Sequence, residues 1–413
     1  MNSTSDILIV GAGLAGAQVA VSLRQGGYEG TVGIIGDEPH APYDRPPLSK
    51  GYLRGEVGRP DLALKSDDFF GDTGVELVTG RTVTEINPAD RMVTDDNGER
   101  FGYGQLVWAA GGSPRRLSIP GAELDGVLSL RSLTDADRIR EAAGSARSAA
   151  IIGGGHIGLE LAAAFRHWNV PVTVIEAQDR LLARVTCPIV SDYYHSLHRN
   201  AGVDVRLAAG VDELVGEDGR VCGAVLSDGS LLTADLVIVG IGLVPNIQPL
   251  ARIGASCSNG VDVDSDGRTS IAGIFAVGDC ANREHPYAGG SRVRLESVPN
   301  ATEQAKIVAN AILGQPQASP APPWFWSHQY DTKLQTVGLL AGHDEAVVRG
   351  DIGSGKFSVV YLRNGVVIAL DCINNVRDFA RGKLLVQEGV RTTADAVRES
   401  ADLKFILDSV GAA

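Results

Sequence analysis

The chain has 413 residues, of which 44% are hydrophobic and 21% charged, and its formal net charge is −13. This length and composition predict two or three domains with substantial cores. The acidic balance argues against nucleic acid or an anionic membrane surface as the main partner, although a local basic patch for an acidic protein remains compatible with it.

The N-terminal segment and the cysteines predict a cytoplasmic protein. Residues 1–6 contain neither a basic region nor a long apolar stretch, so we expect no signal peptide. All apolar runs are strand-sized, and no transmembrane helix is expected. The cysteines are scattered, without a Cys-x-x-Cys pair, which predicts no disulfide framework, metal site or iron–sulfur cluster. They are Cys187, Cys222, Cys257, Cys280 and Cys372.

A first strand–turn–helix–strand pattern opens the chain. Apolar runs at 7–10 and 31–35 predict strands, and 14–26 predicts the helix between them. The turn at 11–16 reads Gly-Ala-Gly-Leu-Ala-Gly, the fingerprint of a dinucleotide site. Its first glycine allows the tight turn, the second lets the pyrophosphate approach, and the third lets helix and strand pack closely. Asp37, beside Glu38, is placed to accept hydrogen bonds from a ribose.

Short alternating segments at 75–108 predict an antiparallel meander that leads into a strand at 106–109. A second copy of the first pattern follows. It has strands at 149–152 and 172–175, a helix at 156–168, and the turn Gly-Gly-Gly-His-Ile-Gly at 153–158. Glu176 ends its second strand and favours NADH over NADPH, because a carboxylate repels a 2′-phosphate. Arg180 and Arg184 lie nearby, and they either soften that preference, form a solvated basic face, or contact the shared pyrophosphate.

The two copies predict an internal duplication, with the second fold inserted into the first. Further short strands are expected at 203–239, a helix at 300–313, a Pro/Ala/Ser linker at 316–323, and strands with a terminal helix beyond it. The predicted fold class is α/β. It comprises a discontinuous FAD-binding domain (1–110 and 242–318), an NADH-binding domain (111–241), both Rossmann-like, and a C-terminal α+β domain (319–413).

Five longer segments carry a family resemblance. Residues 269–279 resemble the second FAD motif of two-dinucleotide flavoprotein reductases of the glutathione-reductase type, and 106–111 resemble their linking motif. Residues 44–50 (Asp-Arg-Pro-Pro-Leu-Ser-Lys), 294–305 and 323–327 are similar to ferredoxin reductases that serve bacterial oxygenases. Ala110 departs from the linking motif, where threonine is usual, and His328 stands where an acid is common.

The resemblance implies two sets of cofactor contacts. The FAD set is Gly11, Gly13, Leu14, Ala15, Gly16, Asp37, Arg45, Lys50, Val83, Ala109, Gly111, Arg131, Gly278, Asp279, Ser297, Val298 and Trp326. The NADH set is Gly153, Gly155, His156, Ile157, Gly158, Glu160, Glu176, Arg184 and Gly242.

The resemblance also implies the residues of the reaction, namely Lys50, Glu160, Glu296, Trp326 and His156. Lys50 and Glu160 are expected to meet beside the flavin ring, where the ammonium stabilises negative charge and the carboxylate orients it. Trp326 is expected near the flavin and the partner, although its spacing fits core packing equally well. His156 stands where the family often carries Tyr, Phe or Val, and we expect it to gate nicotinamide entry.

These features predict an NADH:ferredoxin reductase. Hydride passes from NADH to FAD, and single electrons then pass to a separate [2Fe–2S] ferredoxin that serves a cytochrome P450 or a ring-hydroxylating dioxygenase. Arg294, Lys306 and Lys383 are candidates for docking an acidic ferredoxin, or they are scattered solubilising charges. We expect a monomer or a weak dimer.

Three other functions are possible for a flavoprotein of this kind. A disulfide reductase is excluded, because no cysteine precedes Cys187. Rubredoxin as the one-electron acceptor stays open. So does a slow-turnover redox sensor of the apoptosis-inducing-factor type, although no basic nucleic-acid patch or targeting segment supports it.

Overall fold

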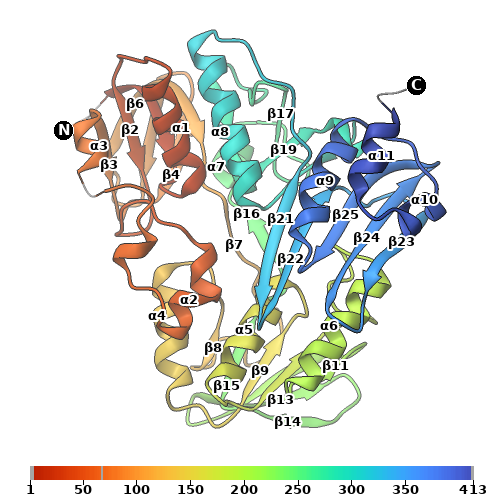
Figure 1. Ribbon diagram of the computed structural model, residues 1–413. Coiled ribbons are helices and arrows are strands. Elements are labelled where there is room, and N and C mark those ends of the chain that lie inside the picture. Colours follow the sequence, from red (N-terminus) through yellow and green to blue (C-terminus); the bar gives the residue numbers. More distant parts are fainter. Residues whose placement is uncertain (1–3, 67, 411–413) are drawn as a thin grey trace. The chain divides into compact units, whose positions relative to one another are not determined.

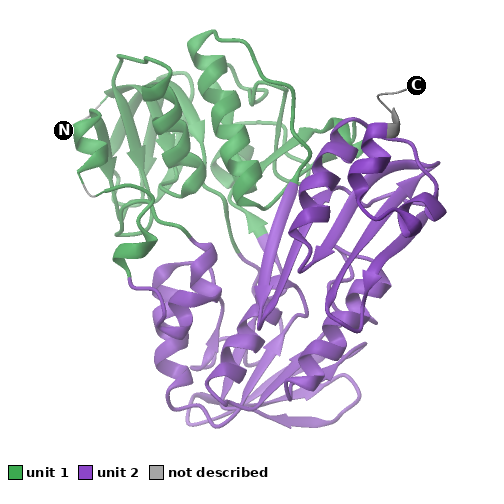
Figure 2. Cartoon of the chain, in the orientation of Figure 1, with its two compact units in different colours: residues 1–44, 59–113, 244–323 green, residues 45–58, 114–243, 324–413 purple. Residues whose placement is uncertain are grey.

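The computed structural model describes residues 4–66 and 68–410. Its internal contacts divide the chain into two compact units, which Figure 2 shows in different colours. Unit 1 comprises residues 1–44, 59–113 and 244–323, and unit 2 comprises residues 45–58, 114–243 and 324–413. Most of the region expected to bind NADH (111–241) and most of the expected C-terminal domain (319–413) fall in unit 2. Residues 45–58, expected in the FAD-binding domain, fall there too.

Unit 1 is built around a seven-stranded sheet with the order β3-β2-β1-β6-β5-β4, and β18 also pairs with β6. β1 runs parallel to β2 and β6, as apolar runs buried on both faces predict. The strands are β1 (Thr4–Val10), β2 (Val32–Ile35), β3 (Val75–Val78), β4 (Val83–Asn87), β5 (Met92–Asp95), β6 (Arg100–Trp108) and β18 (Ile274–Ala276).

The predicted meander holds only in part. β4, β5 and β6 are antiparallel neighbours, but β3 pairs in parallel with β2. The reason lies in the connection, because β3 is reached from β2 through a long segment that ends in helix α3 (Phe69–Asp72). Such a crossover allows parallel pairing, whereas a tight turn enforces antiparallel pairing.

Two helices of unit 1, α1 (Leu14–Gln25) and α8 (Val298–Leu313), lie side by side on one face of the sheet (Figure 1). Their buried residues are mostly Ala and Val, which lets the helices approach closely. The smaller elements are η2 (Pro60–Leu62), α7 (Gln248–Arg252), β17 (Val261–Val263), η3 (Gly278–Cys280), β19 (Ala281–Glu284), η4 (Pro286–Ala288) and β20 (Arg292–Val293).

Unit 2 contains a second parallel sheet, with the order β11-β10-β9-β15-β8. A three-stranded antiparallel sheet, β12-β13-β14, follows β11 in sequence. The strands are β8 (Val127–Leu128), β9 (Ala149–Ile152), β10 (Val172–Ile175), β11 (Asp204–Arg206), β12 (Val211–Glu217), β13 (Arg220–Leu226), β14 (Leu231–Thr233) and β15 (Leu236–Val239). The helical elements are η1 (Pro46–Ser49), α2 (Gly51–Arg54), α4 (Leu133–Ala143), α5 (His156–His167) and α6 (Pro188–Asn200). Separately, β7 (Gly112–Pro114) pairs with β16 (Leu243–Pro245).

The C-terminal part of unit 2 is a five-stranded antiparallel sheet with the order β21-β22-β25-β24-β23, followed by three helices. Residues 315–323, which precede it, form neither helix nor strand. The elements are β21 (Trp324–Gln329), β22 (Thr332–Gly338), β23 (Glu345–Asp351), β24 (Lys356–Arg363), β25 (Val366–Ile373), α9 (Val376–Gln387), α10 (Ala394–Glu399) and α11 (Leu403–Val410).

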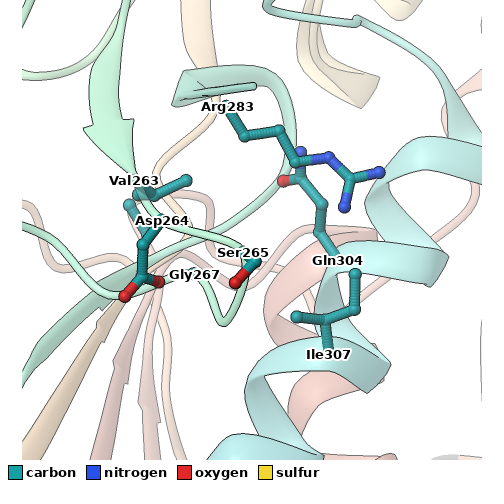
Figure 3. A pocket seen from close by; sticks show the side chains of 8 residues that line it. Val263, Asp264, Ser265, Gly267, Arg283, Gln304 and Ile307 are labelled. Atoms are coloured by element: carbon teal, nitrogen blue, oxygen red, sulfur yellow. The ribbon is translucent and has the colours of Figure 1, made fainter. Parts of the chain in front are cut away.

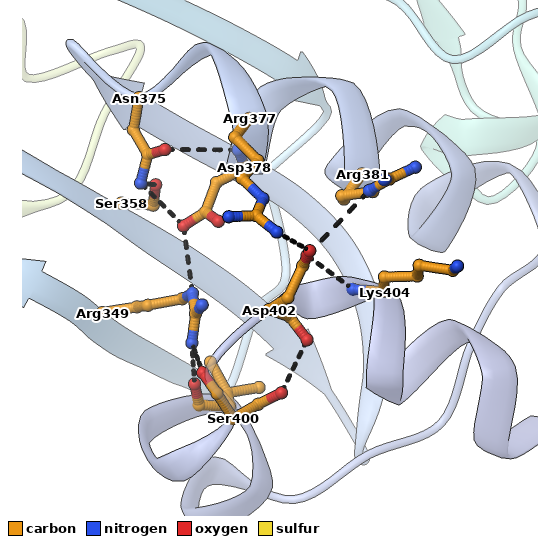
Figure 4. Close-up of polar contacts among 10 residues, drawn as sticks. Arg349, Ser358, Asn375, Arg377, Asp378, Arg381, Ser400, Asp402 and Lys404 are labelled. Atoms are coloured by element: carbon orange, nitrogen blue, oxygen red, sulfur yellow. Dashed lines mark hydrogen bonds and ion pairs between the residues drawn. The ribbon is translucent and has the colours of Figure 1, made fainter.

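Polar contacts hold the last helices in place (Figure 4). Arg349 of β23 donates from Nε to Asp378 Oδ2 on α9 at 3.1 Å, and from Nη1 to the carbonyl of Ser400. Arg377 of α9 donates to Asp402 Oδ2 at 2.5 Å, just before α11. Because the Arg349 and Asp378 side chains are largely buried, their pairing satisfies two charges that burial alone would penalise.

Candidate functional site: two glycine-rich turns and a buried ion pair

The first glycine-rich turn follows β1 in unit 1. Gly11 has φ +116°, and a Cβ added there would lie 2.2 Å from the carbonyl oxygen of Ala109. A Cβ on Gly16 would lie 2.0 Å from the carbonyl oxygen of Gly11. Real atoms cannot approach so closely, so the packing of the chain itself requires glycine at these two positions.

The middle glycine, Gly13, has no such reason within the chain. Its φ of −81° suits any residue, and a Cβ added there would meet nothing within 4 Å. No side chain caps α1 at this point. The first amide groups of α1 therefore face open space beside a residue without a side chain, an arrangement that fits a pyrophosphate. The residues of this turn therefore fit the pyrophosphate of FAD.

Other predicted FAD residues of unit 1 gather at the carboxyl ends of the parallel strands β1, β2, β6 and β18, where ligands of such sheets bind. Asp37, exposed, follows β2, and Ala109 and Gly111 follow β6. A Cβ on Gly278 would lie 2.9 Å from Cβ of Ala15, which shows that η3 packs against the start of α1. Leu14, next in the turn, is half-buried, and so are Asp279, Ser297 and Val298.

The remaining FAD predictions divide between the units. Val83 is 6% exposed and lies in the core of unit 1. Arg45, Lys50, Arg131 and Trp326 belong to unit 2. There, Nη1 of Arg45 donates to the carbonyl of Arg131 at 2.6 Å, so the structure brings these two predicted residues together.

The second glycine-rich turn follows β9 in unit 2 and repeats the first. Gly153 has φ +112°, and its added Cβ would lie 2.4 Å from the carbonyl oxygen of Gly240. A Cβ on Gly158 would lie 2.1 Å from the carbonyl oxygen of Gly153. At Gly155, again, an added Cβ would meet nothing within 4 Å. The same arrangement therefore supports a second dinucleotide at the start of α5, where Ile157 is exposed.

Glu176 closes back onto this turn. Its Oε2 accepts from the Gly154 amide at 2.7 Å and its Oε1 from the Gln178 amide at 2.8 Å. Both bonds fix the carboxylate at the end of β10, as the prediction of a ribose contact requires.

The two arginines beyond Glu176 have different environments. Arg180 donates to the carbonyls of Ala183 and Thr186 and to Ser191 Oγ, at 2.7 to 2.9 Å, so it braces its own loop. Arg184 is exposed, and its guanidinium lies 3.8 Å from a Cβ built on Gly242. None of the alternatives raised from the sequence describes Arg180, which braces its own loop, and Arg184 is the more exposed of the two.

The predicted partners Lys50 and Glu160 form an ion pair in unit 2. Lys50 Nζ lies 2.6 Å from Glu160 Oε2, and the exposed fractions of the two side chains are 16% and 1%. Lys50 also donates to Ser49 Oγ at 3.2 Å and to the Pro46 carbonyl at 3.3 Å. These three acceptors match the three hydrogens of an ammonium group.

Two serines missed in the sequence complete the surroundings of Glu160. Ser49 Oγ donates to Oε2 at 2.5 Å, and Ser327 Oγ on β21 donates to Oε1 at 2.6 Å. A buried carboxylate is stable as an anion only when several donors surround it. A signal for Ser327 was available, because alternation along β21 places Ser327 and Gln329 on the buried face and His328 on the exposed one.

His156 and Trp326 belong to an aromatic cluster on α5 and β21. The His156 ring lies 4.7 Å from the ring of Phe325, and Trp326 lies 5.4 Å from Trp324. Desolvation lowers the pKa of His156 to about 4, so its imidazole is neutral near pH 7. Its Nδ1 is buried and finds no hydrogen-bond partner among the described residues.

The predicted docking residues differ in availability. Arg294 is largely buried and donates to the Asp279 carbonyl at 2.9 Å and to Glu296 Oε1 at 2.6 Å. Lys306 is exposed on α8. Lys383 of α9 stands over the ring of Trp324, 5.4 Å from its centroid.

A small cavity in unit 1 is no cofactor site. Its volume is about 10 Å³, roughly that of one water molecule. Figure 3 shows Arg283 and Gln304 beside it, and Arg283 Nη2 lies 3.3 Å from Glu303 Oε1. The lining residues are Val263, Asp264, Ser265, Gly267, Ala276, Arg283, Gln304 and Ile307.

The fold and the site define an oxidoreductase with two dinucleotide sites. Comparison with known families agrees, since residues 5–305 match the pyridine nucleotide-disulphide oxidoreductase family and residues 324–407 match the reductase C-terminal domain. The chain belongs to this family, among the ferredoxin reductases of the putidaredoxin reductase type. FAD and NAD(H) are the cofactors of these enzymes, as predicted.

Three relatives illustrate the likeness. The chain is 49% identical to the ferredoxin reductase subunit of a 5,5′-dehydrodivanillate O-demethylase from Sphingobium sp., over 96% of each chain. It is 49% identical to a ferredoxin–NAD(P)+ reductase from Sphingomonas sp., over 92% of each chain. Among solved structures it resembles putidaredoxin reductase in its covalent complex with putidaredoxin, with a TM-score of 0.96, 38% identity and full coverage of both chains.

The described parts of the chain, residues 4–66 and 68–410, include no helix that combines the length and the apolar character needed to cross a membrane.

Proposed function

We propose that this protein is an NADH-dependent ferredoxin reductase that feeds a [2Fe–2S] ferredoxin of an oxygenase system. One observation carries the proposal. The chain has two glycine-rich turns, each with a middle glycine open to a ligand, but no cysteine before Cys187 that could continue the electron path within the protein. Electrons must therefore leave to a separate acceptor, and the names of the relatives identify ferredoxin as theirs.

The residues of this chain supply orientation and charge. FAD, when bound, supplies the conversion of a hydride donor into a source of single electrons. The Lys50 ammonium offers a fixed positive charge, and Glu160 holds that ammonium in place. The neutral His156 at the start of α5 adds bulk without charge, which suits the gating role predicted for it.

Glu176 supports NADH as the preferred donor. A carboxylate whose two oxygens are fixed by backbone amides cannot turn away from a 2′-phosphate, so NADPH meets its charge directly. We expect kcat/KM for NADH to exceed that for NADPH by at least tenfold. Equal values of kcat/KM for NADH and NADPH would contradict the role of Glu176. They would not bear on which protein accepts the electrons.

The choice of acceptor is tested by steady-state reduction of a panel of [2Fe–2S] ferredoxins and rubredoxins with NADH. Rapid reduction of at least one ferredoxin supports the proposal. Reduction of rubredoxin alone would favour a rubredoxin reductase. Negligible multiple turnover with every acceptor would favour a redox sensor.

We propose that Lys306 and Lys383 contribute to docking of the ferredoxin, and that Arg294 and Glu296 brace the loop of Asp279 instead. Lys306→Glu should slow ferredoxin reduction several-fold at low salt, and less at high salt, because screening weakens the contact. Ferricyanide reduction should not change. Lys356→Glu, an exposed lysine of β24, is the matched control. Equal losses with both acceptors would contradict the docking role.

We also propose that the first turn, in residues 1–110 and 242–318, binds FAD and that the second, in 111–241, binds NADH. Residues 319–413 form the C-terminal domain. A cytoplasmic location accords with five cysteines that are all free thiols in the structure.

A further inference from the structure

A buried chain of hydrogen bonds leads from Glu160 to helix α6. Beyond Ser327, Gln329 Nε2 lies 3.2 Å from Ser327 Oγ. Gln329 Oε1 lies 2.8 Å from Nε2 of His198 on α6, and Tyr330 Oη lies 3.2 Å from His198 Nδ1. Ser327, Gln329 and His198 are each at most 1% exposed. All these residues belong to unit 2.

The direction of every bond in this chain is fixed by chemistry. The ionised Glu160 can only accept, so the one hydroxyl hydrogen of Ser327 points to it, and Ser327 Oγ must accept from the Gln329 amide group. The Gln329 carbonyl then faces His198, whose Nε2 must carry a hydrogen. Burial lowers the pKa of His198 to about 4, so the ring is neutral and its Nδ1 accepts from Tyr330.

All four donors therefore point toward Glu160. Aligned hydrogen bonds polarise one another, and this alignment directs the positive ends of the dipoles at the carboxylate.

We propose that Ser327, Gln329 and His198 are positioning residues that hold the Glu160 carboxylate aimed at Lys50, and so fix the place of the Lys50 ammonium. The inference rests on the proposed function, since it takes Lys50 to act on the bound flavin. It also gives β21 of the C-terminal domain a part in tuning the cofactor. Without the Ser327 donor, the Glu160 carboxylate is free to turn, the Lys50 ammonium is no longer held in one place, and its field at the flavin weakens.

The test is the midpoint potential of bound FAD at pH 8, measured by equilibrium reduction of the holoenzyme without any protein acceptor. Ser327→Ala should lower the potential by about the equivalent of a tenfold change in the reduction equilibrium, which is about 30 mV for two electrons. Gln329→Met, a substitution of similar volume, should lower it by less, because Ser327 remains but is no longer oriented.

Ser358→Ala is the matched control. Ser358 is also 0% exposed in the C-terminal sheet, but its Oγ accepts from Asn375 Nδ2 at 3.1 Å and does not contact Glu160. It should destabilise the fold to a similar degree and leave the potential unchanged. If Ser327→Ala folds poorly, the midpoint potential of Gln329→Met tests the inference instead.

Wild-type potentials in both Ser327→Ala and Gln329→Met, or shifts matched by Ser358→Ala, would overturn the inference. A wild-type protein that binds no FAD, or that NADH does not reduce, would instead overturn the proposed function.

Discussion

The two glycine-rich turns use one backbone device twice. In both, the first glycine has a φ above +110° and the third packs its Cα against the carbonyl of the first. In both, the middle glycine faces open space. The backbone geometry of the turn is thus the same at the two sites. The side chains must account for the difference between them.

The difference lies in what the helices carry. The buried residues of α1 are Ala, Gly, Val and Leu, and they pack this helix on the sheet beside α8. Among the buried residues of α5 is Glu160, whose carboxylate reaches Lys50, Ser49 and Ser327. The buried face of α1 is apolar throughout, whereas the buried face of α5 also carries a carboxylate. A duplicated nucleotide fold can therefore specialise through a single buried side chain.

The largest loss of stability is expected from substitutions at the third glycine of each turn. Gly16→Ala and Gly158→Ala each place a methyl group about 2 Å from a backbone oxygen. We expect each to lower the free energy of unfolding by about 3 kcal/mol or more. Chemical denaturation measures this, with Gly13→Ala and Gly155→Ala as controls at open positions. Wild-type stability in either third-glycine variant would show that the turn can relax, contrary to this account.

Asp371, a buried carboxyl on β25, makes the stability of unit 2 depend on pH. Desolvation raises the pKa of Asp371 to about 6, although Thr186 and Tyr361 donate to it. Because the folded pKa exceeds the unfolded one, the stability from this group is present below about pH 4 and is lost as the pH rises toward 6. Asp371→Asn should remove that loss, on the order of 2 to 3 kcal/mol above pH 6.

The measurement is unfolding free energy from pH 4 to 8, compared between wild type and Asp371→Asn. The curves should approach each other near pH 4 and separate toward pH 6. Parallel curves would mean that Asp371 keeps an ordinary pKa in the folded protein.

The middle glycines should separate the two cofactors. Gly13→Ala should weaken FAD binding at least tenfold, and Gly155→Ala should do the same for NADH, since each methyl group occupies space next to the pyrophosphate. Flavin content and NADH titration of the holoenzyme measure the two effects. If either variant lost both ligands equally, the two turns would not be independent sites.

The smallest effect is expected at Glu176. Glu176→Gln keeps an oxygen that can accept from Gly154 but removes the charge, so discrimination against NADPH should fall by several-fold with stability nearly unchanged. The ratio of kcat/KM for the two donors checks this. An unchanged ratio would assign the discrimination to Arg184 or to the backbone.

Much of this could be predicted from the sequence. Apolar runs of four residues ending in Gly-x-Gly-x-x-Gly predicted both parallel strands and both turns, because few backbones other than strand–turn–helix need glycines so spaced. The meeting of Lys50 with Glu160 came only from the family resemblance. These residues are 110 positions apart, and no periodicity connects them.

Other features needed coordinates. From the sequence, Arg180 is expected to be an unpaired cation in a loop. The structure shows that it donates to two backbone carbonyls. Asp371 stands out as a lone acid in the apolar strand β25, but the sequence does not show that Thr186 covers it. Likewise, alternation places Gln329 inside, but nothing local reveals that His198 of α6 is the group it meets.

The Ser327 hydroxyl on Glu160 has a consequence for engineering. Here, a chimaera joined at the 316–323 segment would also replace one donor of the buried carboxylate and the amide that orients it. Grafts that retain Ser327 and Gln329 should preserve the colour and potential of the flavin, whereas grafts that lose them would alter the cofactor together with the partner.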